Sequence, residues 1–211
     1  MFPLGVLKKR LAGLQEILNL QFEGANNSTV FTDSSSYART VSTAFGTPKI
    51  STAQSAEGAS SLLLDGVSGI SVPDSNSLDF GNKDFEISLF VRPTATPNLT
   101  YLISRWTPPS GLSYQIFFSS SGEMVGSFRI VSSSDRIVQS TTTIPQNAWT
   151  KVRFTKDSIN LKLYINDVLE ATTASLNATI SNETAQMVIG CWPLGGGGFV
   201  GYLDKLIIKR G

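Results

Sequence analysis

Two runs of alternating apolar and polar residues between positions 149 and 168 constrain the fold more than any other stretch. Alternation with a period of two places every second side chain on the same face of an extended strand. The polar pair Asp157-Ser158 separates the two runs, and Asn166-Asp167 offers a second tight turn. We therefore predict consecutive antiparallel hairpins with one buried face. The residues predicted on that face are Val152, Phe154, Ile159, Leu161, Leu163 and Ile165.

The rest of the chain, from residue 20 onward, continues this pattern. Short apolar runs alternate with turns rich in Gly, Pro, Ser and Asn, and charged residues make up only 16% of the sequence. Roughly a dozen strands spaced in this way are typical of a β-sandwich or barrel. No linker-like change of composition interrupts this part. We therefore expect an all-β fold in which residues 20–211 form one domain.

The composition argues against several classes of function. The formal net charge is +1 and no basic stretch runs along the chain, so we expect no nucleic-acid partner. No run approaches the roughly 20 apolar residues of a membrane-spanning helix, so we expect no membrane insertion. Histidine is absent, which excludes Ser-His-Asp and Cys-His catalysis. Because Cys191 is the one cysteine, no internal disulfide can form.

Residues 1–19 carry the one helical pattern in the sequence. Leucines recur there at intervals of three and four, as on one face of a helix, and Pro3 suits a helix start. We predict a short N-terminal α-helix over residues 2–19, within a segment 1–19 that anchors the protein or joins copies of it, with a homotrimer favoured. The alternative is that the helix packs on its own sandwich or frays, because so short a helix is marginal alone in water. The leucine stripe consists of Leu4, Leu7, Leu11, Leu14 and Leu18.

Several segments, taken in order, resemble one family. They are Leu20-Gln21-Phe22-Glu23-Gly24, Phe31-Thr32-Asp33-Ser34-Ser35, Leu63-Leu64-Asp65-Gly66, Val72-Pro73-Asp74-Ser75, Leu78-Asp79-Phe80-Gly81, Asp84-Phe85-Glu86-Ile87, Trp149-Thr150-Lys151-Val152, Leu163-Tyr164-Ile165-Asn166 and Gly201-Tyr202-Leu203-Asp204. Over residues 20–209 this pattern resembles the laminin-G-like, concanavalin A-like jelly-roll domains, in the variant common in bacteriophage virion proteins and bacterial surface proteins. Asp167 departs from the Gly usual in the family, and Leu89-Phe90 departs from the usual Phe-Trp.

The resemblance implies a sandwich of two curved antiparallel sheets. It also implies a binding function, because the family mostly binds glycans or proteins, although some relatives are polysaccharide hydrolases or lyases. Many members hold a calcium ion away from the ligand groove. Here the resemblance points to Glu23 near the first strand, Asp204 on the last strand and Asp33 in a nearby loop. The alternative is that these carboxylates cap turns or accept backbone hydrogen bonds.

Aromatic side chains near loops are the candidate carbohydrate-binding residues, because sugars stack their C–H faces on Trp and Tyr rings. Trp106 precedes Pro108-Pro109, and Trp192 precedes Pro193 and a glycine-rich loop. Tyr101 and Tyr114 are the next candidates. The alternative for each is a place at the edge of the core, and Trp149 is predicted to lie in the core itself.

Catalysis has little support in the sequence. Hydrolases of this fold carry two or more carboxylates on one strand as Glu-x-Asp-x-x-Glu, and lyase relatives use histidine. Asp84-Phe85-Glu86 offers two acids on one face without the third, and the chain has no histidine. We therefore expect no enzymatic activity and name no catalytic residue.

Together these features predict a structural protein of a bacteriophage virion, such as a capsid fibre, a decoration protein or a tail-associated protein. Its jelly-roll domain is expected to bind host-surface glycans, while residues 1–19 contact other virion proteins. One alternative is a purely structural virion protein that binds no sugar. The other is a polysaccharide-degrading enzyme.

Overall fold

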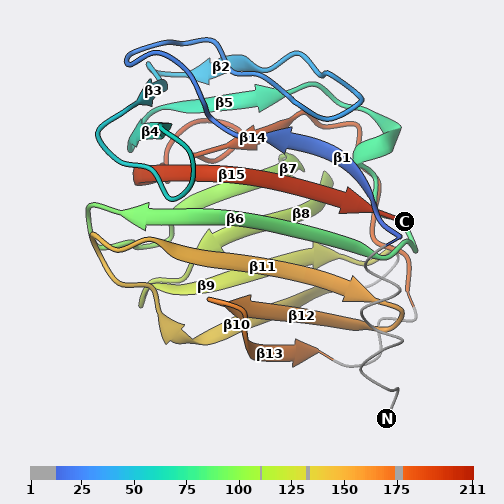
Figure 1. The fold of residues 1–211 in the computed structure, drawn as a ribbon. Helices are drawn as coiled ribbons and strands as arrows, with labels where there is room; N and C mark the ends of the chain where they lie inside the picture. Colours follow the sequence, from blue (N-terminus) through green and yellow to red (C-terminus); the bar gives the residue numbers. More distant parts are fainter. Residues whose placement is uncertain (1–12, 110, 132–133, 174–177) are drawn as a thin grey trace.

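The protein is a sandwich of two antiparallel sheets packed face to face (Figure 1). The computed structural model describes residues 13–109, 111–131, 134–173 and 178–211. Within these ranges the one helical element is a short 3-10 helix, η1 (Asn76–Leu78), and no described helix is long and apolar enough to cross a membrane. The predicted all-β jelly-roll sandwich is therefore confirmed.

The first sheet has eight strands, in the order β13-β12-β11-β6-β15-β4-β3, with β1 paired to β15. The second has seven, in the order β10-β9-β8-β7-β14-β5-β2. The strands of the first are β1 (Gln15–Leu20), β3 (Lys49–Ser51), β4 (Ser61–Asp65), β6 (Phe85–Pro93), β11 (Thr150–Asp157), β12 (Asn160–Ile165), β13 (Val168–Thr173) and β15 (Val200–Arg210). Those of the second are β2 (Ser42–Phe45), β5 (Gly69–Val72), β7 (Tyr101–Thr107), β8 (Gly111–Phe118), β9 (Glu123–Arg129), β10 (Asp135–Thr143) and β14 (Met187–Ile189).

The hairpins predicted between positions 149 and 168 are present. β11 pairs with β12 in antiparallel register, and β12 pairs with β13. Five of the six residues predicted on the buried face are buried, but Ile159 is 43% exposed because it lies in the turn itself. The second turn has positive φ at both Asn166 (49°) and Asp167 (63°). Asn and Asp tolerate this conformation better than most residues other than glycine, so the turn forms without the glycine usual in the family.

The prediction of an N-terminal helix is wrong for residues 15–19, because these residues belong to β1. This strand runs along β15, pairing Gln15 with Arg210 and Leu20 with Leu206. Leu18 is fully buried in the core between the sheets, so burial and ladder hydrogen bonds outweigh the helical spacing of the leucines. Leu14 packs near the C-terminal Gly211. The sandwich thus begins before residue 20, whereas Leu4, Leu7, Leu11 and the rest of the predicted helix lie outside the described residues.

Candidate functional site

A row of four aromatic rings lies on the outer face of the seven-stranded sheet. The ring centroids of Phe117 and Tyr101 are 5.4 Å apart, those of Tyr101 and Trp192 are 6.2 Å apart, and those of Trp192 and Trp106 are 4.9 Å apart. All four side chains are partly exposed. The structure therefore brings together three of the four residues proposed from the sequence to bind sugar, and adds Phe117.

Strand irregularities place these rings on one face. Tyr101 and Trp106 are separated by an odd number of positions on β7, so a regular strand would point them to opposite faces. The register shifts between Tyr101 and Ile103, where β7 carries one residue more than its partner β8. This bulge reverses the alternation. As a result both rings face outward, while Leu102 and Ile103 are both buried in the core.

The loop that follows β14 positions Trp192. Its backbone N–H donates to the Gly196 carbonyl (3.1 Å), and the Gly195 N–H donates back to the Trp192 carbonyl (2.9 Å). The next residue along, Gly197, accepts a hydrogen bond from the Tyr101 N–H (2.8 Å). The glycine-rich loop noted in the sequence thus fixes Trp192 beside the start of β7.

Polar groups lie in the same face as the aromatic row. A cross-strand series runs Ser71, Val188, Ser104, Gln115, Ser127 through the registers of five neighbouring strands. Ser104, between Tyr101 and Trp106 on β7, is fully buried and accepts a hydrogen bond from Gln115 Nε2 (2.9 Å). Ser71, Gln115 and Ser127 are buried as well, so the surface that this part of the face offers to a ligand is that of the partly exposed rings, on which sugar C–H faces can stack.

Tyr114 does not belong to this row, so its prediction as a sugar-binding residue is wrong. It faces the interior of the sandwich, where its ring packs against Phe80 (centroids 4.7 Å apart) and its hydroxyl donates to Met187 Sδ (3.7 Å). Burial raises the pKa of Tyr114 to about 12. Tyr114 is one of the residues of β8 whose side chains point into the core. The sequence did not show which alternate residues of this strand point inward.

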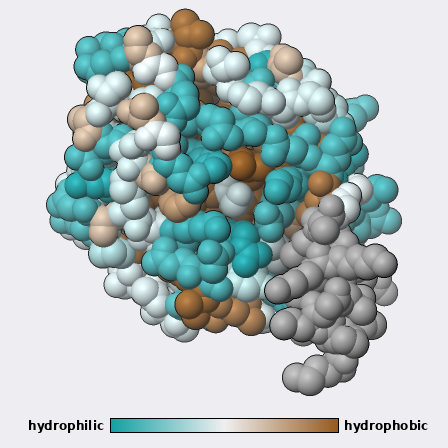
Figure 2. Space-filling model, viewed as in Figure 1, coloured by the Kyte–Doolittle hydropathy of each residue, from teal (hydrophilic) through white to brown (hydrophobic). Residues whose placement is uncertain are grey.

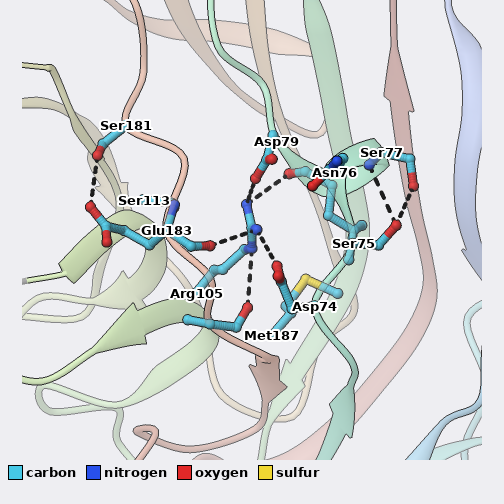
Figure 3. Close-up of polar contacts among 12 residues, drawn as sticks. Asp74, Ser75, Asn76, Ser77, Asp79, Arg105, Ser113, Ser181, Glu183 and Met187 are labelled. Atoms are coloured by element: carbon cyan, nitrogen blue, oxygen red, sulfur yellow. Dashed lines mark hydrogen bonds and ion pairs between the residues drawn. The ribbon is translucent and has the colours of Figure 1, made fainter.

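A buried arginine forms the densest polar cluster near this face, and the sequence reasoning missed it (Figure 3). Arg105 is 1% exposed and its guanidinium contacts the carboxylates of Asp74 (2.5 Å) and Asp79. It also donates to the carbonyls of Leu78 (3.3 Å), Glu183 (2.7 Å) and Ala185 (3.2 Å). All five of its N–H groups have nearby acceptors. Arg105 thus ties the loop around η1 and the loop before β14 to β7, and its role is to hold the sheet that carries the aromatic row.

Burial favours a lower pKa for Arg105, but its neighbours outweigh burial and the pKa is raised. The hydrogen bonds to Asp74 and Asp79 and the charge of Asp79 contribute to this shift. Arg105 therefore stays charged across the accessible pH range. The one sequence signal for it was a single arginine inside an otherwise uncharged strand.

Asp33 caps a turn and does not lie in a metal site. Its carboxylate accepts hydrogen bonds from the backbone N–H groups of Asn19 (2.9 Å), Ser35 (3.0 Å) and Arg39 (2.9 Å). Although burial opposes ionisation, these hydrogen bonds lower its pKa overall. The prediction that Asp33 binds calcium gives way to the turn-capping alternative, because both carboxylate oxygens already have donors.

Glu23 and Asp204 lie close together across the loop that precedes β4. Asp204 Oδ2 accepts hydrogen bonds from the N–H groups of Ala56 (2.8 Å) and Glu57 (3.1 Å), and Glu23 accepts one from Ala59 (3.1 Å). Asp204 is fully buried, and its Oδ1 accepts no hydrogen bond from a described residue. Burial raises the pKa of Asp204, and the charge of Glu23 raises it further. Within the described ranges, no group of three or more acidic or cysteine side chains is placed to hold a metal ion.

A family model for the concanavalin A-like lectin/glucanase superfamily, Laminin_G_3, matches residues 64–209, more than half of the chain. The chain belongs to this family. The matched residues include the end of β4, β5 to β14 and nearly all of β15, and therefore all four rings of the aromatic row. A search of curated proteins found no match to the sequence.

Solved structures share the Laminin_G_3 fold at low sequence identity. Domain 4 of AbnA, an extracellular arabinanase of Geobacillus stearothermophilus solved with arabinotriose, is 20% identical with a TM-score of 0.71, covering 94% of this chain and 93% of that one. The binding domain of Paraclostridial Mosquitocidal Protein 1 is 18% identical (TM-score 0.71, covering 92% and 48%). The botulinum neurotoxin serotype D ligand-binding domain, solved with N-acetylneuraminic acid, is 16% identical (TM-score 0.70, covering 95% and 49%). The chain spans about half the length of the two toxin domains.

Proposed function

We propose that this protein is a non-enzymatic carbohydrate-binding module of a bacteriophage virion and that it binds host-surface glycans along the aromatic row. The row carries the proposal: Tyr101, Trp192 and Trp106 lie in ring contact with one another, and all three side chains are partly exposed. Sugar C–H faces stack on such rings.

Two relatives support a sugar ligand. The structures of the arabinanase domain and of the serotype D toxin domain were solved with arabinotriose and N-acetylneuraminic acid, respectively. The virion setting rests on the sequence resemblance, and contacts with other virion proteins and a homotrimeric assembly rest on the leucines of the stripe that precede β1, which are Leu4, Leu7 and Leu11. A virion protein that binds no sugar is the second candidate, and a glycan panel distinguishes the two.

Replacing Trp106 or Trp192 by alanine should weaken glycan binding about tenfold for each residue, because each indole supplies both buried apolar area and ring stacking. The measurement is binding of the purified chain to host-envelope polysaccharides, with thermal denaturation to verify folding. Trp149→Ala is the matched control. Contrary to its predicted place in the core, Trp149 is partly exposed and packs against Tyr202 on the other sheet.

Each possible result separates the two candidates. Full binding by both Trp106→Ala and Trp192→Ala would remove the aromatic row as the site. A folded wild-type protein that binds no glycan in the panel would favour the purely structural virion protein.

We also propose that Glu23 and Asp204 hold a calcium ion. The residues fit this role in one respect: Asp204 Oδ1 is a buried carboxylate oxygen without a donor, beside a second carboxylate. Calcium prefers such oxygens as ligands. When bound, it would supply a positive charge to compensate the negative charge of the buried carboxylate. Asp204 itself anchors the loop at Ala56 and Glu57 to β15 through its Oδ2.

The calcium proposal predicts a thermal shift that depends on Asp204. Calcium at about 100 times its dissociation constant should raise the free energy of unfolding of the wild-type protein by about 2.7 kcal/mol. Asp204→Asn should abolish this stabilisation. Glu57→Gln is the control, because the Glu57 side chain is about half exposed and pairs with Lys205. Equal calcium stabilisation of the wild type and Asp204→Asn would reject the site.

Without calcium, the raised pKa of Asp204 also sets the direction of a pH effect. A carboxyl group whose pKa is raised by folding contributes stability below its unfolded pKa, and this contribution is lost as the pH rises through the folded pKa. The ordinary pKa of this carboxyl group is 3.8, and folding raises it. The stability of Asp204→Asn relative to wild type should therefore increase as the pH rises from 3 to 7. Chelator-treated protein followed by thermal denaturation gives this difference. A constant difference across the range would contradict the raised pKa.

A further inference from the structure

The outer face of the eight-stranded sheet carries a separate hollow of about 210 Å³, over β6, β11 and β15. It lies beside a bulge in β15, where the pairing with β6 shifts between Asp204 and Ile207 and Lys205 has a φ of 48°. A bulge bends its strand and redirects the side chains next to it. Figure 2 shows this face, with hydrophilic side chains surrounding a small exposed apolar area near its centre.

The lining of the hollow includes apolar surface. Phe90 on β6 and Ile207 on β15 both point outward and are partly exposed, in a face that is otherwise mostly polar. Ser88, which pairs with Ile207 across the two strands, adds a hydroxyl group. A ring and an aliphatic side chain beside a hydroxyl suit a ligand with an apolar face and polar edges, such as a sugar ring.

The charged side chains that line the hollow are mainly basic. Four cations, Lys151, Arg153, Lys205 and Lys209, line it together with two carboxylates, Glu57 and Glu86. The excess of positive charge on a concave surface attracts anions.

The cations of the hollow differ in how they are paired with carboxylates. Arg153 is held over the ring of Tyr164 (3.8 Å to the centroid), with the carboxylates of Glu86 at 3.6 Å and Asp167 at 3.7 Å. Lys151 pairs with Asp167 (3.1 Å), which is more than half exposed, and such a pair is weak enough to exchange for a ligand. Among the described residues Lys209 makes no ion pair, although Glu16 and Glu86 flank it on the neighbouring strands.

We propose that this hollow binds a negatively charged sugar residue of an acidic polysaccharide, with the sugar ring on Phe90 and Ile207 and the anionic group between Lys151, Arg153 and Lys209. The site lies on the opposite outer face of the sandwich from the aromatic row. The two faces together give one module two contacts with polysaccharide, and two contacts on one body raise the overall affinity above that of either alone.

The test measures binding of the full chain to three probes: oligogalacturonate, dextran sulfate and neutral dextran. The double variant Lys151→Gln/Lys209→Gln should bind oligogalacturonate about tenfold more weakly, because it loses two charge-assisted contacts. Phe90→Ala should also weaken binding. Lys49→Gln is the matched control, since Lys49 lies on β3 of the same sheet outside the hollow, and it should bind as the wild type does.

Each outcome decides the proposal. Binding of oligogalacturonate and dextran sulfate but not of dextran supports recognition of any anionic group, whereas binding of oligogalacturonate alone supports recognition of a carboxylate. Three results would overturn the proposal: no binding to either acidic probe, wild-type binding by the double variant, or an equal loss with Lys49→Gln. A Trp106→Ala/Trp192→Ala variant that loses all oligogalacturonate binding would assign that ligand to the aromatic row instead.

Discussion

Arg105→Met should lower the free energy of unfolding by about 3 kcal/mol, because it leaves carboxylates without their cation in a largely buried cluster. Methionine keeps the apolar length of the side chain, so the loss reports the guanidinium itself. Asp74 keeps 35% of its side chain exposed and can recover some hydration, which places the effect at the lower end of the usual range for a broken buried ion pair. In a chain of this size the melting temperature should fall by about 10 °C.

The control for this prediction is another arginine–aspartate pair in the same sheet. Arg129 contacts Asp135 on the neighbouring strand, but its side chain is 39% exposed. Arg129→Met should therefore change stability by less than about 1 kcal/mol. Urea denaturation measures both variants. If Arg105→Met were no more destabilised than Arg129→Met, the buried cluster would not hold the loops to β7 as the contacts in Figure 3 indicate.

The sandwich was predictable because period-two alternation reports burial directly. The apolar residues between positions 152 and 165 identified the hairpin of β11 and β12, and their pairing follows from two tight turns. β1 was not predictable in the same way. Its leucine spacing fits a helix locally, and the strand forms because β15, at the other end of the chain, extends beyond its pairing with β4 and there pairs with β1. Local patterns do not contain such long-range pairing.

The aromatic row was predictable in part. Residue type alone suggested Trp106, Trp192 and Tyr101, since large aromatics near loops are common in sugar-binding sites. Whether the rings on β7 face outward depends on the bulge between Tyr101 and Ile103, and no residue in the sequence predicts this bulge. The same uncertainty explains the error at Tyr114, whose ring faces the core.

The charged residues were the least predictable part. Asp33 carries a local signal that was available, because Asp followed by Ser often forms a turn in which the carboxylate accepts the N–H two residues later. The partners of Arg105 come from two distant loops, and the hollow on the eight-stranded sheet depends on cross-strand neighbours. These sites follow from the topology of the sheets, so the sequence could supply only their residue types.

Gly198→Ala should destabilise the fold by about 3 kcal/mol, at the upper end of overpacking effects, and should disturb the aromatic row as well. A Cβ at position 198 would lie 2.2 Å from the carbonyl oxygen of Gly66, so one of the two backbones must move. This backbone contact adjoins the hydrogen bond from the Gly66 N–H to the Phe199 carbonyl (3.0 Å) and that from Tyr101 to Gly197. Displacing the loop should therefore shift Trp192 relative to Tyr101 and weaken glycan binding.

Gly196→Ala separates the steric effect from the general cost of replacing a loop glycine. No atom lies within 4 Å of a Cβ at position 196, and the strain comes from its φ of 82° alone. That strain costs about 1 kcal/mol. Urea denaturation gives the stabilities, and near-ultraviolet circular dichroism reports the contacts between the tryptophan rings. Equal stabilities and unchanged aromatic signals in the two variants would show that the loop can move away from Gly66 without disturbing Trp192, and that the row does not depend on this contact.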